Sequence, residues 1–282
     1  EYPIVAAQQS AQSRRSLGIG YIGLAHYLAK NHVAYGDKEA LELVDETTEA
    51  FQYYLLKASN QLAIEKGQCE YFEKTKYSDG ILPIDTYKKD IDKIVKRKLS
   101  YDWKQLRKDI QEHGLRHSTL SAQMPSESSS VVSNATNGIE PPRDYLSVKK
   151  SKKGTLKQIV PDYYRLKNFY TLLWDMPSNE GYINVVATMQ KYFDQAISGN
   201  WSYNPQNYKD GEVPISVMAN DLLTTYKLGW KTSYYQNTYD AKTDLDEPAH
   251  PVGWHDNQKE MKSREEFESQ EDYDDYCEAC MI

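Results

Sequence analysis

The chain has 282 residues, of which 39% are hydrophobic, and it carries a formal net charge of −7 at pH 7. This length suits one large domain or two small ones. The acidic total argues against nucleic acid as a partner, and no run of about 18 apolar residues is present that could cross a membrane. Three cysteines are too few for a disulfide framework, so we expect a cytoplasmic protein in a reducing compartment.

The negative charge is concentrated toward the C-terminus. Residues 240–282 hold 14 Asp and Glu against 4 Lys and Arg, a net charge of −10, so residues 1–239 carry +3 of the total of −7. The acidic part has no apolar periodicity and contains Pro248, Pro251 and Gly253, a composition typical of disorder. We therefore divide the chain into a folded part, 1–239, and a disordered acidic tail, 240–282.

Apolar residues at a spacing of three or four predict that much of the folded part is helical. Gly18, Gly20 and Gly23 fit GxGxxG in outline, but no strand–helix–strand unit follows, so they indicate close backbone packing rather than a dinucleotide site. Cys69 has no second ligand nearby and is expected to be a packed or surface thiol. The predicted helices cover 16–30, 38–66, 85–96, 102–113, 163–174, 179–198 and 214–228.

Strand-like segments are expected at 118–122, 145–148, 158–160 and 231–238. The basic loop 149–157 contains five lysines, and it fits a solvated hairpin tip better than an anion site. The last segment contains Tyr234 and Tyr235. Neighbouring side chains of a strand point to opposite faces, so two tyrosines on one face would need an irregular backbone or a strand end. The chain contains 24 tyrosines, so two adjacent tyrosines are not unusual here. From the composition alone we interpret this pair as structural.

The segment 115–143 is poor in charge and rich in Ser, Thr and Asn. Within it Pro125 precedes Ser126, Glu127, Ser128, Ser129 and Ser130, and two valines follow. Ser is a favoured N-cap, so a helix is predicted to begin near Ser128 with its first N–H groups ringed by hydroxyls. Such a helix end binds phosphate readily, although an ordinary serine-capped helix that binds nothing explains the same pattern.

Cys277 and Cys280 form a CxxC pair two residues before the last residue, Ile282. A zinc site would need two further ligands, and His250 and His255 are too sparse and too poorly placed to supply them. We therefore expect no metal here and favour a mobile redox dithiol on a solvated tether.

Several blocks, taken in order, resemble the C-terminal part of the large, catalytic subunit of class I (Ia-type) ribonucleotide reductases. The resemblance extends over nearly the whole chain, which makes it highly specific. One departure is important, because the stretches that carry the radical cysteine and the buried redox cysteine pair of that family lie upstream of anything present here. The resembling blocks are SLGIGYIGLAHYLAK, FQYYLLKASNQLA, GILPIDTYKKD, YDWKQLR, MPSESSSVVSNATNGIEPPR, KTSYYQNT and CEACMI.

The resemblance implies an α/β fold, namely the C-terminal half of a ten-stranded α/β barrel with surrounding helices and a flexible acidic tail. It implies that the diphosphate of a ribonucleoside diphosphate is held by the segment Pro125, Ser126, Glu127, Ser128 and Ser129. Tyr234 and Tyr235 would transfer the radical by proton-coupled electron transfer, the phenol being protonated beforehand because its pKa lies near 10. Cys277 and Cys280 would reduce the active-site disulfide and then be reduced by thioredoxin or glutaredoxin.

The resemblance also implies partners. This chain would bind no cofactor, and the metal-radical cofactor would belong to a small, radical-generating subunit. An N-terminal fragment of the large subunit would supply the missing cysteines, as in a split subunit of phage-like type. Apolar residues of the helix 214–228 would border the groove for the small subunit's tail, although core packing explains that apolar face equally well. The alternative function is a non-catalytic remnant that binds a partner or a nucleotide without turnover.

Overall fold

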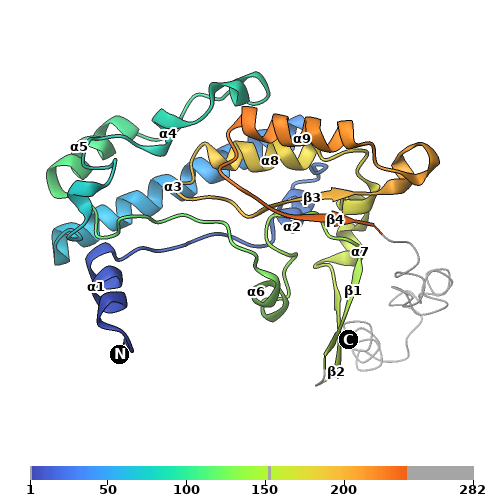
Figure 1. The fold of residues 1–282 in the computed structure, drawn as a ribbon, viewed down its shortest axis with the longest axis horizontal. Helices are drawn as coiled ribbons and strands as arrows, with labels where there is room; N and C mark the ends of the chain where they lie inside the picture. The colour runs from blue at the N-terminus through green and yellow to red at the C-terminus, as the bar shows by residue number, and fades with distance from the viewer. Residues whose placement is uncertain (1, 152–153, 240–282) are drawn as a thin grey trace, which may run out of the picture.

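The computed structural model describes residues 2–151 and 154–239, and its backbone is built around one long helix. Helix α3 (Lys38–Lys66) runs along the length of the molecule, with α5 (Trp103–His113) near one end and α8 (Glu180–Gln190) and α9 (Ile215–Leu228) toward the other (Figure 1). The remaining α-helices are α1 (Val5–Arg14), α2 (Leu24–Lys30), α4 (Pro83–Thr86), α6 (Glu127–Val132) and α7 (Tyr163–Leu166). No helix of this described part is long and apolar enough to cross a membrane.

The helices predicted over 38–66 and 102–113 are confirmed. Helix α3 has the predicted bounds and ends at Gly67, whose φ of 82° is a conformation that favours glycine. The side chain of Asp102 caps α5 by accepting a hydrogen bond from the Gln105 amide at 2.9 Å. Cys69 is a packed thiol, 1% exposed.

Four other predicted helices are wrong in extent. The segment predicted as helix from residue 16 is not helical until α2 begins at Leu24, because a parallel neighbour bridges to it at Ile19. The region 85–96 contains only α4 and a short 3₁₀ turn, separated by extended backbone at Tyr87. The region 163–174 is likewise broken after α7 into 3₁₀ turns. Helix α8 ends at Gln190, eight residues before the predicted end at Ser198, because the chain there joins a layer of extended segments.

Extended segments form a parallel layer beneath the helices. Strand β3 (Gly199–Tyr203) pairs in parallel with β4 (Ser233–Thr238), which confirms the strand predicted at 231–238. Single parallel bridges join Ile19 to Ser121 and Gln123 to Ile197. The strand predicted at 118–122 is therefore reduced to isolated bridges, and the spatial order of segments is 17–20, 119–123, 197–203 and 233–238. The molecule is thus of the α/β class.

Glycine permits the closest approach within this layer. A Cβ atom on Gly20 would lie 2.5 Å from the carbonyl oxygen of Ala122, and the Ala122 amide donates to the carbonyl of Ile19 at 2.9 Å. Any side chain at Gly20 would therefore force the two segments apart. The prediction that glycine serves close packing is confirmed at Gly20, whereas a Cβ atom on Gly18 or Gly23 would meet only ordinary contacts, at 3.5 and 3.8 Å.

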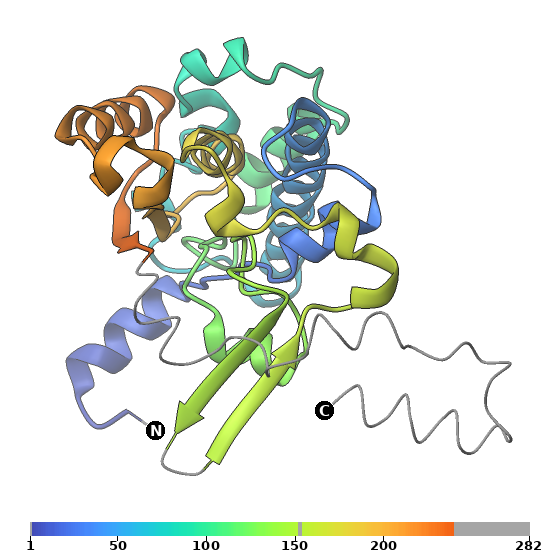
Figure 2. The ribbon, with the colours of Figure 1, turned by 90° about the vertical axis from the view of Figure 1, so that its right-hand side faces the viewer.

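A β-hairpin projects from the helical body. Strands β1 (Leu146–Ser151) and β2 (Gly154–Ile159) pair antiparallel from Leu146 opposite Ile159 to Ser151 opposite Gly154. Figures 1 and 2 both show this hairpin extending away from the helices. The predicted hairpin is confirmed, but the predicted loop 149–157 is too long, because residues 149–151 and 154–157 belong to the paired strands.

The apolar face of α9 points to solvent. Ile215, Leu223 and Tyr226 are 83%, 67% and 72% exposed, whereas the same helix buries Asp221 and Leu228. Core packing within this chain therefore does not account for the apolar face, and that alternative is wrong.

A buried ionic network joins α3 to α8. The carboxylate of Asp45, which is fully buried, accepts hydrogen bonds from Lys191 Nζ at 2.5 Å, Tyr192 Oη at 3.0 Å and Arg97 Nε at 3.2 Å. One turn along α3, Glu49 is also fully buried and pairs with the same guanidinium. Each buried charge in this group is therefore compensated by an opposite one.

Removing one partner of this network should lower the free energy of unfolding. Asp45→Ala leaves the Lys191 ammonium buried without its carboxylate, so the free energy of unfolding should fall by about 3–5 kcal/mol. Lys38→Ala, which breaks an exposed pair with Glu42 on the same helix, should change it little. Urea unfolding checks both, and an equal effect of the two substitutions would contradict the prediction.

A second buried carboxylate, that of Asp194, joins the 119–123 segment to the segment that follows α8. It accepts from the amides of Leu120 at 2.8 Å and Ser121 at 3.0 Å, and from Tyr77 Oη at 2.9 Å. Burial raises its pKa, and these donors lower it by less, so the net shift is upward from 3.8. The folded chain therefore binds this proton more tightly than the unfolded chain does.

The raised pKa of Asp194 determines how the stability of the fold changes with pH. Because the pKa of Asp194 is higher in the folded chain than in the unfolded chain, this carboxyl stabilises the fold most at low pH. Its contribution to the free energy of unfolding falls as pH rises from the unfolded pKa through the folded pKa. Asp194→Asn does not titrate, so the stability of the wild type relative to this variant should decrease as pH rises from the ordinary carboxyl pKa of 3.8 through the raised native pKa. Urea unfolding at several pH values measures it, and a relative stability that increases with pH would mean that the hydrogen-bond donors outweigh burial.

Candidate functional site

The serine-rich segment forms a short helix that begins one residue earlier than predicted. Helix α6 begins at Glu127, and Ser126 is its N-cap residue with φ −126° and ψ 27°. The hydroxyl of Ser126 is buried, and within the described residues it has no hydrogen-bond partner. The side chains of Ser128 and Ser129 are exposed at the same helix end, as are Pro125 and Glu127.

The first turn of α6 offers amide donors next to these hydroxyls. The Ser130 amide donates to the carbonyl of Ser126 at 2.8 Å, so it is already used within the helix. The amides of Ser128 and Ser129 come earlier in the turn, where no intrahelical acceptor is available. A group with several acceptor oxygens and a negative charge would match this arrangement.

The end of the serine-rich segment packs against the start of α6 through Gly138. Gly138 has a φ of 51°, and a Cβ atom there would lie 2.8 Å from the hydroxyl oxygen of Ser126. Its amide donates to the hydroxyl of Ser130 at 3.3 Å, and its carbonyl accepts from the Leu24 amide at 3.2 Å. The short α6 is therefore fixed against α2 by the returning backbone.

Tyr234 and Tyr235 lie side by side because strand β4 is bulged. The parallel register runs from Gly199 opposite Ser233 to Trp201 opposite Gln236, so the two tyrosines face the single residue Asn200. A bulge of this kind places two adjacent side chains on the same side of the strand. The prediction that the pair would need an irregular backbone to share a face is confirmed.

The two phenols are in contact. Their ring centroids are 4.1 Å apart with an interplanar angle of 51°, and the hydroxyl of Tyr234 lies 3.4 Å from that of Tyr235. This hydrogen bond raises the pKa of Tyr234. Both side chains are open to solvent, at 48% and 60% exposure. The pair is therefore accessible from outside this chain.

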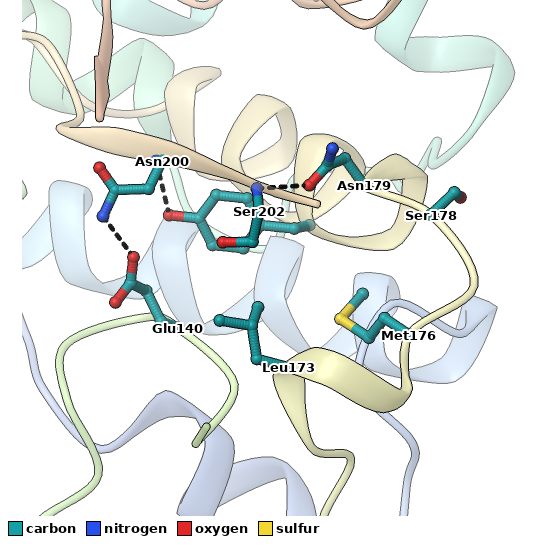
Figure 3. A pocket seen from close by; sticks show the side chains of 8 residues that line it. Glu140, Leu173, Met176, Ser178, Asn179, Asn200 and Ser202 are labelled. Carbon is teal, nitrogen blue, oxygen red and sulfur yellow. Dashed lines mark hydrogen bonds between the residues drawn. The ribbon is translucent and has the colours of Figure 1, made fainter. Parts of the chain in front are cut away.

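A small cavity that sequence reasoning missed lies beside Asn200 and Ser202 of β3 (Figure 3). It has a volume of about 10 Å³ and is lined by Glu140, Asn179, Asn200 and Ser202 among others. The Asn200 amide nitrogen donates to the Glu140 carboxylate at 2.5 Å, and burial raises the pKa of that carboxyl. The available signal for this site in the sequence was Glu140, which stands immediately before two prolines. A carboxylate that becomes buried needs a hydrogen-bonding partner.

The remaining predicted residues divide between described and undescribed parts. Cys277 and Cys280, like the predicted acidic tail, lie outside the described residues. Cys69 is buried, and burial raises the pKa of its thiol, so it is a poor nucleophile. Across 2–151 and 154–239, no three His, Cys, Asp or Glu side chains are grouped so that they could hold a metal ion.

Comparison with known proteins assigns the family. Residues 1–236 match the family model described as "Ribonucleotide reductase, barrel domain". The chain is 60% identical over 247 residues to the ribonucleoside-diphosphate reductase subunit alpha of Haemophilus influenzae, covering 88% of this chain and 33% of that protein.

Two further relatives agree. The chain is 56% identical to ribonucleoside-diphosphate reductase 1 subunit alpha of Escherichia coli, covering 89% of this chain and 33% of that protein. It is 46% identical to the subunit alpha of Enterobacteria phage T4, covering 85% and 32%. The chain thus spans about a third of the length of the curated relatives it matches. A match over residues 1–236 of 282 establishes that this chain belongs to the ribonucleotide reductase barrel-domain family.

Proposed function

We propose that this chain is the C-terminal part of a class Ia-type ribonucleotide reductase large subunit. In that role it reduces ribonucleoside diphosphates to 2′-deoxyribonucleoside diphosphates once it is assembled with the rest of the large subunit and a radical-generating small subunit. The observation that carries the proposal is the bulge in β4, which brings the Tyr234 and Tyr235 rings to 4.1 Å. A structural pair on a regular strand would have no need of this arrangement.

The tyrosine pair suits proton-coupled electron transfer. Each phenol can lose an electron and a proton together, and the hydroxyl contact of 3.4 Å allows the proton to pass from one oxygen to the other. Tyr235 is the more exposed and would receive the radical from the small subunit, which would hold the metal-radical cofactor. Tyr234 would pass the radical onward to a cysteine outside these 282 residues.

The serine-rich turn is proposed to hold the substrate's diphosphate. Its supports are the buried, unpartnered hydroxyl of Ser126 and the exposed hydroxyls of Ser128 and Ser129 at the start of α6. Pro125 and Glu127 complete the segment. The amide donors and the partial positive charge of a helix start favour a phosphate, and a charge-assisted hydrogen bond is stronger than a neutral one.

The parallel layer is proposed to be part of a half barrel. Segments 17–20, 119–123, 197–203 and 233–238 run in the same direction, as neighbouring strands of one half of the ten-stranded barrel would. The outer segments have unpaired edges that favour pairing with further strands. Those strands, together with the radical cysteine, would come from the N-terminal part of the large subunit.

The first functional prediction concerns substrate binding. In the assembled enzyme, Ser128→Ala and Ser129→Ala should each weaken diphosphate binding by about 1–2 kcal/mol, raising the KM while the kcat at saturating substrate is kept. Ser133→Ala, at the opposite end of α6, serves as the matched control and should leave both constants unchanged. Steady-state kinetics check this, and an unchanged KM in the double variant would count against the diphosphate site.

The second functional prediction tests the reductase function itself. With thioredoxin or glutaredoxin as the reductant, Cys277→Ser and Cys280→Ser should each abolish turnover. With dithiothreitol, which reaches the active-site disulfide directly, these variants should stay active, because the tail only relays thiol–disulfide exchange. Tyr234→Phe should be inactive with either reductant, since phenylalanine cannot relay the radical.

A control comes from the other adjacent pair, Tyr53 and Tyr54. Tyr54 is 55% exposed on α3 and contacts Tyr53 edge to face, so Tyr54→Phe should retain activity with both reductants. If diphosphate reduction is absent in the wild-type assembly, the chain is instead a remnant without turnover. If reduction persists in Tyr234→Phe, the proposed radical transfer through Tyr234 is wrong.

A further inference from the structure

The bulge in β4 leaves a backbone amide without its usual backbone acceptor, and the side chain of Asn200 accepts from it instead. Because Tyr234 and Tyr235 together face Asn200, one of their amides falls outside the regular ladder. The Tyr235 amide donates instead to Asn200 Oδ1 at 2.9 Å. The side chain of Asn200 thus occupies the place of the missing backbone acceptor, and the bulge is closed without an unsatisfied N–H group.

The orientation of the Asn200 amide is fixed from behind. Its Nδ2 donates to Glu140 Oε1 at 2.5 Å, and Glu140 Oε2 accepts from Asn137 Nδ2 at 3.1 Å. An amide can present either its oxygen or its nitrogen to a neighbour, and a carboxylate accepts only. Glu140 therefore selects the orientation in which the oxygen of Asn200 points to Tyr235.

We propose that Asn200, oriented by Glu140, is a positioning residue that holds the tyrosine pair in contact. This inference rests on the proposed radical transfer through Tyr234 and Tyr235 and adds to it the device that keeps their hydroxyls together. Asn200 does not touch the phenol oxygens in the contacts of the described chain. It acts through the backbone of Tyr235, and its effect is on the geometry of the pair.

The geometry predicts a loss in rate and not in substrate binding. Asn200→Ala removes the acceptor, so the backbone of the bulge is no longer held at Tyr235 and the two rings can move apart. Misplacement of reacting groups by about 1 Å can cost on the order of 100-fold in rate, so kcat should fall by roughly 10- to 100-fold. The KM for the diphosphate should stay unchanged, because the serine-rich turn is intact.

A second readout is independent of turnover. With 3-fluorotyrosine at position 234, a ¹⁹F NMR titration of the full chain follows the phenol that Tyr235 perturbs. The hydroxyl contact raises the pKa of Tyr234, so Asn200→Ala should bring that pKa back toward the value of the same fluorinated residue in a Tyr235→Phe chain. Asn204→Ala is the matched control. Asn204 lies just past the far end of β3 and caps a short turn through the Gln206 amide, so its loss should leave the pKa of residue 234 and kcat as in wild type.

A paired substitution guards against simple misfolding. Asn200→Asp keeps the acceptor for Tyr235 but sets two carboxylates against each other, so it should lower kcat as Asn200→Ala does. Combining it with Glu140→Gln restores one donor and one acceptor in reversed order, and kcat and the pKa at residue 234 should return toward wild type.

The outcomes separate this inference from the proposed function. Loss of the raised pKa in Asn200→Ala with rescue by the reversed pair supports the positioning role, even if the wild-type assembly proves to have no reductase activity. A pKa at residue 234 that is unchanged in Asn200→Ala, or a reversed pair that behaves no better than Asn200→Asp alone, overturns it.

Discussion

The carboxylate of Asp45 is the interaction on which the arrangement of this molecule depends. It lies at 0% exposure in the long central helix α3 and binds Lys191 and Tyr192, which directly follow α8. Two buried charges of opposite sign are stable in only one relative position, because either alone would have to be desolvated without compensation. The same contact therefore fixes the point at which the chain leaves α8. From there it turns through Asp194 into the layer of extended segments that includes β3.

That layer connects the two parts of the candidate site. One segment, 126–140, begins with the buried hydroxyl of Ser126 and ends with the carboxylate of Glu140. Glu140 reaches Asn200 of β3, and Asn200 reaches the backbone of Tyr235. The serine-rich turn and the tyrosine pair are thus joined by the backbone of 126–140 and by the two hydrogen bonds that Asn200 makes.

Sequence reasoning succeeded where the decisive forces are local and failed where they are not. The 3.6-residue periodicity of 38–66 and the cap at Asp102 specify their helices without help from the rest of the chain. The non-helical backbone at 16–23 could not be foreseen, because it is set by a neighbour about 100 residues away along the chain. The site followed the same rule. The serine-rich turn and the tyrosines were visible as motifs, whereas Asn200 and Glu140 become a pair only when their segments meet.

The bulge also makes the length of one stretch of chain functionally important. Between the C-cap glycine Gly229 and Gln236, which faces Trp201 again in register, the strand carries one more residue than its partner requires. Deleting one residue from 230–233 would place Tyr234 opposite Gly199 and Tyr235 opposite Asn200, with Gln236 still opposite Trp201. In that even register the two neighbouring side chains point to opposite faces of the strand. Point substitutions elsewhere in β4 change a side chain, but a single-residue deletion would separate the two phenols while leaving both in the sequence. In evolution this stretch is therefore expected to vary in composition and to be constant in length.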